Sequence, residues 1–130
     1  MRYLLDVNAL VAFGFQDHQF HPLVRRWLGI ERPSAVFTCS ITELGFVRVL
    51  AQVRQYGFSV ESARELLLRL KKDTTTQLTF IEDANDITHL PDWASTPRQT
   101  TDAHLVQLAL AHNARLATLD STLPGAYQIL

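Results

Sequence analysis

Four acidic residues stand at comparable places in this chain, and together they could hold a divalent metal ion. Asp6 directly follows the apolar stretch YLL, and Asp120 directly follows RLATL. Glu43 and Asp102 each lie near the start of a segment whose apolar residues have helical spacing. Four carboxylates in one cleft would repel each other, and at least one would take up a proton unless a cation were bound.

The donor type indicates which cation and which chemistry. Oxygen ligands without a histidine or cysteine cluster favour Mg²⁺ or Mn²⁺ over Zn²⁺. Two such ions about 4 Å apart activate a water and stabilise the leaving oxygen of a phosphodiester. The remaining charges suit a polyanionic substrate. Ten of the twelve cations are arginine, and if four of the thirteen acids belong to the metal site, nine acids remain against the twelve cations. Ordinary solvated charges would explain the same balance.

Each acid also has an explanation that involves no metal. Glu43 follows Ser40 by three residues in SITE, which predicts a capping box in which Glu43 accepts from the Ser40 amide. Asp102 would be favourable at a helix start, and Asp120 could begin a turn. Asp6 is the hardest to explain in this way, because apolar neighbours predict burial and an unpaired buried carboxylate is costly. One shared site accounts for all four acids.

The elements that would position these acids alternate along the chain. Strands are predicted at 3–5, 35–39, 79–81, 115–119 and 127–130. Helices are predicted at 9–13, at 21–28, from Ser40, after a cap at Ser59, and at 102–113 with Thr100 or Thr101 as its cap. This order predicts a three-layer α/β/α fold with a central, mainly parallel sheet. Sites in such folds lie outside the carboxyl ends of the strands, where the four acids fall.

Composition limits the remaining possibilities. A length of 130 residues predicts one domain over 1–130, and 47% hydrophobic residues are typical of a globular chain. No apolar run approaches the ~20 residues of a membrane span, and the stretch before Asp6 is shorter than the ~7–15 residues of a signal sequence. The single cysteine, Cys39, excludes an internal disulfide. We therefore expect a soluble cytoplasmic protein with no membrane partner.

Four motifs of the chain together resemble those of a known family. DVNAL, TEL, TDAHLVQLA and ATLD are similar, in order and spacing, to the motifs of the PIN domain, and especially to VapC-type toxins of bacterial toxin–antitoxin pairs. The resemblance covers nearly the whole chain, and HPLVRRWL is similar to the family's second helix. It implies a PIN-like fold and an Mg²⁺- or Mn²⁺-dependent endoribonuclease that hydrolyses RNA. A cognate antitoxin that blocks the cleft and a homodimer are implied as partners.

The resemblance also implies roles for single residues. The metal-binding, catalytic acids would be Asp6, Glu43, Asp102 and Asp120. Asn8 would orient Asp6 or a water on the metal, and Thr118 would be a hydroxyl donor beside the last acid. LDSTLPG lacks the aromatic or basic residue that commonly follows that acid in the family.

The irregular stretch DANDITHLPDWASTPRQ, residues 83–99, supplies two candidate substrate contacts. Trp93 could stack on a base or lie at a dimer contact, although packing is the simpler explanation. Arg98 could contact phosphate or be an ordinary solvated arginine. His104 and His112, two turns apart on one predicted helix, are expected to face solvent. The cations of the segment 64–72 could form an RNA-contacting edge or only a polar helix face.

Two other functions compete with the nuclease. A HAD-type phosphatase also has an aspartate after its first strand, but it needs a second acid two residues later, where this chain has Asn8. The five glycines form neither a dinucleotide-binding nor a P-loop motif. The alternative that remains is a non-catalytic PIN-like module that binds RNA or protein.

Overall fold

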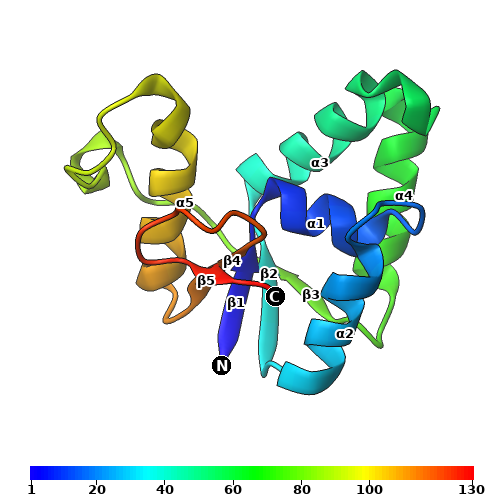
Figure 1. The fold of residues 1–130 in the computed structure, drawn as a ribbon, viewed down its shortest axis with the longest axis horizontal. Coiled ribbons are helices and arrows are strands. Elements are labelled where there is room, and N and C mark those ends of the chain that lie inside the picture. The colour runs from blue at the N-terminus through cyan, green and yellow to red at the C-terminus, as the bar shows by residue number, and fades with distance from the viewer.

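The computed structural model describes residues 1–130 and contains one five-stranded parallel sheet (Figure 1). Its strands are β1 (Arg2–Leu5), β2 (Ala35–Thr38), β3 (Leu78–Phe80), β4 (Arg115–Thr118) and β5 (Tyr127–Gln128). Their order is β3-β2-β1-β4-β5, and every neighbouring pair is parallel. The predicted parallel sheet is confirmed, with boundaries that shift by one or two residues.

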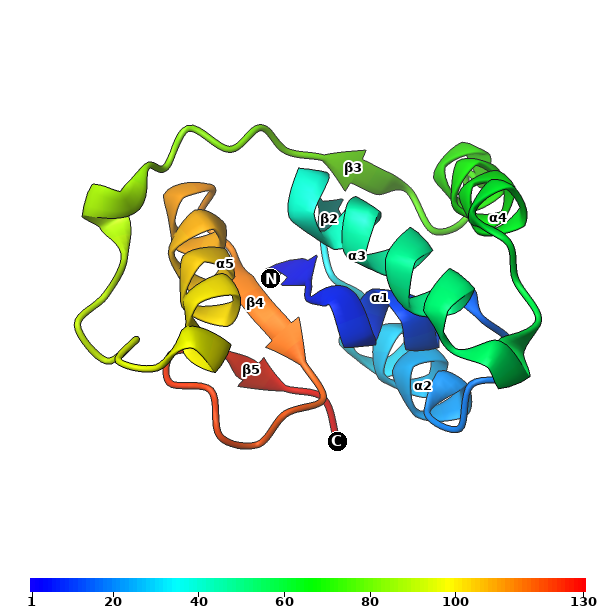
Figure 2. The ribbon, with the colours of Figure 1, turned by 90° about the horizontal axis from the view of Figure 1, so that it is seen from above.

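Helices cover both faces of the sheet unequally, as Figure 2 shows. They are α1 (Val7–Gly14), α2 (His21–Glu31), α3 (Ser40–Gln52), α4 (Val60–Lys72) and α5 (Thr100–Ala111). The first four lie on one side of the sheet, and α5 alone lies on the other. No helix in the structure is both long enough and apolar enough to cross a lipid bilayer.

The central strand β1 is buried on both faces because its side chains alternate between the two layers. Tyr3 and Leu5 belong to the apolar cluster under α1–α4, whereas Leu4 packs in the cluster under α5 with Leu105 and Leu108. All five side chains are almost completely buried. This double burial fixes the backbone that delivers Asp6 to the carboxyl edge of the sheet.

The strand order places a switch point beside β1. The chain runs from β1 through β2 to β3 on one side, and it then returns to place β4 and β5 on the other side of β1. Ligand sites of open α/β sheets form outside the carboxyl ends of the strands at such a point. The crevice above β1 and β4 is therefore the expected place for a site.

Local caps show where sequence patterns succeed and fail. The Ser59 hydroxyl accepts a hydrogen bond from the Ser62 amide at 3.0 Å, which confirms the predicted cap of α4. The predicted cap of α5 is wrong, because its N-cap is Gln99, without a side-chain hydrogen bond. Thr96 instead opens a 3₁₀ turn at Pro97–Gln99 that leads directly into α5. Asn113 has a φ of 55°, and this left-handed conformation ends the helical path as predicted.

His104 in α5 and His112 at its C-terminal cap are half-buried, whereas the sequence predicted that they face solvent. His104 Nε2 contacts the carboxylate of Asp83, and His112 Nε2 lies 3.0 Å from the carbonyl oxygen of Glu82. The chain that leaves β3 therefore lies along α5, and this contact between distant segments has no signature in helical spacing. The following residues form short 3₁₀ turns at Ile87–His89 and Pro97–Gln99, consistent with the predicted irregular stretch.

Candidate active site

Asp6 lies at the carboxyl end of β1 and is the N-cap of α1. Its Oδ1 accepts a hydrogen bond from the Ala9 amide at 2.8 Å, and its Oδ2 accepts one from the Thr118 hydroxyl. Its own amide donates to the Ala117 carbonyl at 3.1 Å, so β4 holds both its backbone and its side chain. Only 5% of Asp6 is exposed.

The environment of Asp6 disfavours its negative charge. Burial raises the pKa of Asp6 from 3.8 to about 6, although the hydrogen bonds from Thr118 and Ala9 act in the opposite direction. The nearby carboxylates of Asp102 and Asp120 raise this pKa further. The pKa of Asp102 is also raised, first by burial and then by Asp120. The structure thus brings three of the four predicted acids within electrostatic reach of one another.

Thr118 links two of these acids. Its hydroxyl donates to Asp6 Oδ2 and accepts a hydrogen bond from the Asp120 amide at 3.0 Å. The Asp120 carboxylate is held in turn by the amide and hydroxyl of Thr122, at 2.8 and 2.7 Å. These hydrogen bonds, with a smaller contribution from the charge of Arg98, lower the pKa of Asp120. Asp120 therefore stays ionised beside the more buried Asp6.

A cavity of about 320 Å³ opens beside these acids. Asp102, Asp120, Trp93 and Arg98 are among the residues that line it, so both predicted substrate contacts share a cavity with two of the acids. Trp93 is half-buried and also packs against the apolar cluster under α5. Packing and an exposed ring face are therefore compatible at this position.

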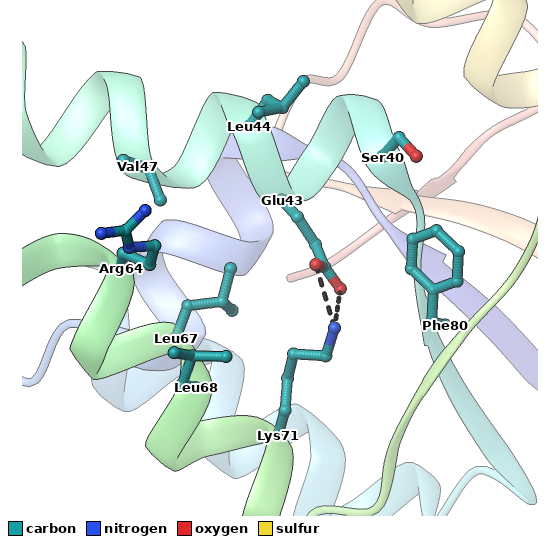
Figure 3. A pocket seen from close by; sticks show the side chains of 9 residues that line it. All are labelled: Ser40, Glu43, Leu44, Val47, Arg64, Leu67, Leu68, Lys71 and Phe80. Atoms are coloured by element: carbon teal, nitrogen blue, oxygen red, sulfur yellow. Dashed lines mark hydrogen bonds and ion pairs between the residues drawn. The ribbon is translucent and has the colours of Figure 1, made fainter. Parts of the chain in front are cut away.

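Glu43 lies on the side of α3 that faces α4 (Figure 3). Lys71 Nζ is 3.0 Å from its Oε1 and 2.8 Å from its Oε2, and the Thr38 hydroxyl donates to Oε2 at 2.6 Å. No three His, Cys, Asp or Glu side chains of the structure are arranged to hold one metal ion together. The four acids divide into three aspartates whose charges affect one another and a glutamate that is paired with Lys71.

The predicted capping box at SITE is wrong by one residue. The N-cap of α3 is Cys39, and the Thr42 hydroxyl accepts from the Cys39 amide at 3.0 Å. The helix begins at Ser40, so Glu43 falls one position beyond the box and its carboxylate is free for other contacts. Cys39 itself is buried in the cluster under α5, as expected of a small apolar residue.

Asn8 makes no hydrogen bond to Asp6, and its side chain is exposed on the first turn of α1. The contacts that orient Asp6 come from the Ala9 amide and the Thr118 hydroxyl. Two contacts of Glu43, Thr38 and Lys71, were not predicted as part of a site. Lys71 lies 28 residues from Glu43, so no local spacing could have identified this pair.

The three aspartates fit a hard divalent cation. The ligand atoms that they offer are carboxylate oxygens, which Mg²⁺ and Mn²⁺ prefer. A buried carboxylate beside two like charges is costly until an opposite charge compensates it. Asp6, Asp102 and Asp120 therefore form a set that a divalent cation would stabilise.

Comparison with known proteins places this geometry in a family. The PIN domain family model matches residues 3–127. The chain belongs to the PIN domain family. Among its curated relatives, Ribonuclease VapC44 of Mycobacterium tuberculosis is 36% identical over 136 aligned positions, which cover 97% of this chain and 94% of the relative. Ribonuclease VapC38 of the same organism is 34% identical, with 91% and 84% covered. The resemblance to the VapC branch of the PIN family is confirmed.

Solved structures support the PIN fold. VapBC2 from Rickettsia felis, crystallised with a DNA fragment from its promoter, superimposes with a TM-score of 0.64 at 16% identity and covers 98% of this chain and 97% of its own. VapC20 of Mycobacterium tuberculosis, described as a sarcin–ricin loop cleaving toxin, gives a TM-score of 0.63 at 16% identity and covers 92% and 91%. At this identity the two likenesses establish the fold alone.

Proposed function

We propose that residues 1–130 form one PIN-like nuclease domain that acts as a metal-dependent endoribonuclease toxin. The observation that carries the proposal is the buried Asp6 carboxylate, which Thr118 links to Asp120 and which lies within electrostatic reach of Asp102. This arrangement stands at the carboxyl ends of β1 and β4 in a chain whose relatives are named ribonucleases. Hydrolysis of RNA phosphodiester bonds is the reaction that fits it.

Asp6, Asp102 and Asp120 would hold Mg²⁺ or Mn²⁺, and Glu43 would be the fourth ligand. In a two-metal scheme, two such cations would activate a water and stabilise the leaving oxygen. Thr118 keeps Asp6 directed towards the crevice through its hydroxyl. Burial excludes water around Asp6, which strengthens its attraction for a cation.

The cavity beside the acids suits a single-stranded stretch of RNA. Arg98 presents a guanidinium that can contact a phosphate, and Trp93 presents an aromatic face on which a base can stack. Asn8 is exposed on α1 next to Asp6, where its amide can contact the substrate or a water. These three residues would position RNA, while the acids carry the reaction.

A cognate antitoxin and a second copy of the chain are the proposed protein partners. The antitoxin is supported by the VapBC2 neighbour, which is a complex, and by the VapC names of the relatives. The homodimer is supported by the family resemblance, and light scattering of the purified chain tests it. An endoribonuclease that meets cellular RNA and an antitoxin would act in the cytoplasm.

Incubation of the antitoxin-free chain with total cellular RNA tests the proposal. We expect cleavage with Mg²⁺ or Mn²⁺, none with EDTA, and none by Asp6→Asn under either condition. Asp17→Asn, which removes an exposed acid from the loop after α1, is the matched control and should cut normally. Cleavage in EDTA, or equal cleavage by Asp6→Asn, would contradict the mechanism.

The position of Glu43 favours one second candidate, a PIN-like module that binds RNA or protein without cutting. With Glu43 paired to Lys71, three acids remain around the crevice. Binding of RNA in a filter assay without cleavage of any RNA at saturating Mn²⁺ would support this module over the nuclease.

A further inference from the structure

Lys71 is the only lysine or arginine of the chain that forms an ion pair with a carboxylate. It comes from the last turn of α4 and contacts both oxygens of Glu43, at 3.0 and 2.8 Å. The two side chains are 29% and 19% exposed, so water screens the pair incompletely. The Lys71 ammonium also lies 5.3 Å from the centre of the Phe80 ring, and this cation–π contact further fixes it.

The partners of Glu43 already occupy its carboxylate oxygens. The Thr38 hydroxyl donates to Oε2, so Lys71 and Thr38 together engage both carboxylate oxygens (Figure 3). The like charges that raise the pKa of Asp6 are those of Asp102 and Asp120. A cation bound to the aspartates could recruit Glu43 only if the carboxylate gave up its contact with Lys71.

We propose that Lys71 is a positioning residue that competes with the divalent cation for Glu43. The inference rests on the proposed function, because it needs a cation at the aspartates. In the metal-free chain the ammonium holds Glu43 on the α4 side of α3. On metal binding, Glu43 would exchange its monovalent partner for a divalent one, and Lys71 would be released. Lys71 thereby weakens the apparent affinity of the chain for its metal.

The surroundings give a released lysine somewhere to go. A cavity of about 370 Å³ lies between α3 and α4, and Lys71, Glu43, Leu44 and Phe80 are among the residues that line it. Leu44 and Phe80 are 69% and 44% exposed, so the cavity is open to solvent. The ammonium can therefore regain water when it leaves Glu43.

Calorimetric titration with Mn²⁺ tests the competition. We expect Lys71→Met to bind Mn²⁺ about two- to fivefold more tightly than the unmodified chain, the range expected for loss of one partly exposed ion pair. Lys72→Met removes the neighbouring exposed charge and should leave the affinity unchanged. In a Glu43→Gln background, Lys71→Met should have no effect. Unchanged or weaker Mn²⁺ binding by Lys71→Met with a normal thermal unfolding profile would overturn the inference.

Amine labelling gives a second readout that does not depend on activity. Lys71 and Lys72 are the only lysines in the sequence, so each experiment contains its own control. Saturating Mn²⁺ should raise acetylation of Lys71 relative to Lys72, as measured by mass spectrometry of the tryptic peptides. In Glu43→Gln the ratio should be high already and should not respond to Mn²⁺. A ratio that Mn²⁺ leaves unchanged in the unmodified chain would contradict the release of Lys71.

The two proposals fail in different ways. If the unmodified chain binds no Mn²⁺ and cuts no RNA, the nuclease proposal fails and this inference falls with it. If the chain binds Mn²⁺ and cuts RNA but neither affinity nor labelling depends on Lys71, only the inference fails.

Discussion

The three aspartates and Glu43 all carry carboxylates, but they are held by different kinds of partner. Asp6 and Asp120 are held by hydrogen bonds from hydroxyl and amide donors, which carry no formal positive charge. Glu43 is held by an ammonium, which compensates its charge within the chain. The charges of Asp6 and Asp102, whose pKa values burial raises, therefore cost folding free energy until a cation compensates them. This difference supports the proposal that a divalent cation would bind at the aspartates rather than at Glu43 alone.

Replacing Asp6 should have the largest effect on RNA cleavage. Asp6→Asn keeps the shape of the side chain but removes the charge that attracts the cation. We expect RNA cleavage to fall by more than about a hundredfold, because even residues that only support metal ligands cost ten- to a hundredfold. Single-turnover cleavage of a defined RNA at saturating Mn²⁺ measures this loss. A variant with more than a tenth of the normal rate would remove Asp6 from the catalytic set.

The same aspartate should make the metal-free chain less stable as the pH rises. The pKa of Asp6 is about 6 when folded and near 3.8 when unfolded, so the native state binds more protons between these values. The free energy of unfolding in EDTA should therefore fall between pH 4 and 6, by up to about 3 kcal/mol for a shift of two pKa units.

Comparison with Asp6→Asn isolates this contribution, because the other titrating groups are shared. Urea denaturation should show the variant more stable than the unmodified chain at pH 7.5 and equal to it near pH 4. Saturating Mn²⁺ should restore the stability of the unmodified chain and leave the variant unaffected. Parallel pH profiles of the two proteins in EDTA would contradict the uncompensated charge.

Removing the hydroxyl that links two aspartates tests the neutral donors. Thr118→Val keeps the shape but removes the donor to Asp6 and the acceptor for the Asp120 amide. We expect the cleavage rate to fall about ten- to a hundredfold and the free energy of unfolding to fall by about 1–2 kcal/mol. Thr118→Ser should retain most of both. If the serine variant lost as much activity as the valine variant, the methyl group rather than the hydroxyl would be responsible.

A smaller effect is expected at the rim of the cavity. Arg98→Gln should raise the KM for RNA about three- to tenfold, leave kcat nearly unchanged and make the KM less sensitive to salt, since one phosphate contact is lost. Arg26→Gln, an exposed position on α2, is the control and should show none of these changes. Steady-state cleavage at two salt concentrations measures the effect. A change in kcat alone would place Arg98 in the reaction rather than in binding.

The smallest effect should appear in the stability of the Glu43–Lys71 pair. A double-mutant cycle with Glu43→Gln and Lys71→Met in EDTA should give a coupling energy below about 1 kcal/mol, because the pair is partly exposed. Urea denaturation of the four proteins measures it. A coupling several times larger would mean that this pair is a main support of the α3–α4 contact and not a replaceable one.

The sequence predicted those features that depend on local patterns. Apolar runs located the five strands, and the apolar neighbours of Asp6 predicted its burial, which the structure confirms. Ser59 was identified as a cap because its hydrogen bond closes within three residues. The parallel sheet followed from the alternation of strands and helices.

Features that depend on distant segments were not predictable in this way. The N-cap of α3 is Cys39 and not the predicted Ser40, because the Thr42 hydroxyl accepts the hydrogen bond of the Cys39 amide. Glu43 is therefore not used in the cap and pairs with Lys71. The contacts of His104 and His112 depend on the path of residues 82 and 83 along α5. The spacing of residues in a single sequence does not determine which of several nearby donors a side chain will bond. The metal-ligand roles of the four acids stay predictions.

The position of β1 in the middle of the sheet has a consequence for synthesis of the protein. Asp6 leaves the ribosome before its partners Thr118 and Asp120, and 112 residues separate Asp6 from Thr118. Pairing of β1 with β4 must therefore wait until β4 has been synthesised. A nascent or truncated chain that ends before residue 115 carries the first acid but cannot assemble the site. The order of strands thus makes assembly of Asp6 with Thr118 and Asp120 depend on synthesis of β4.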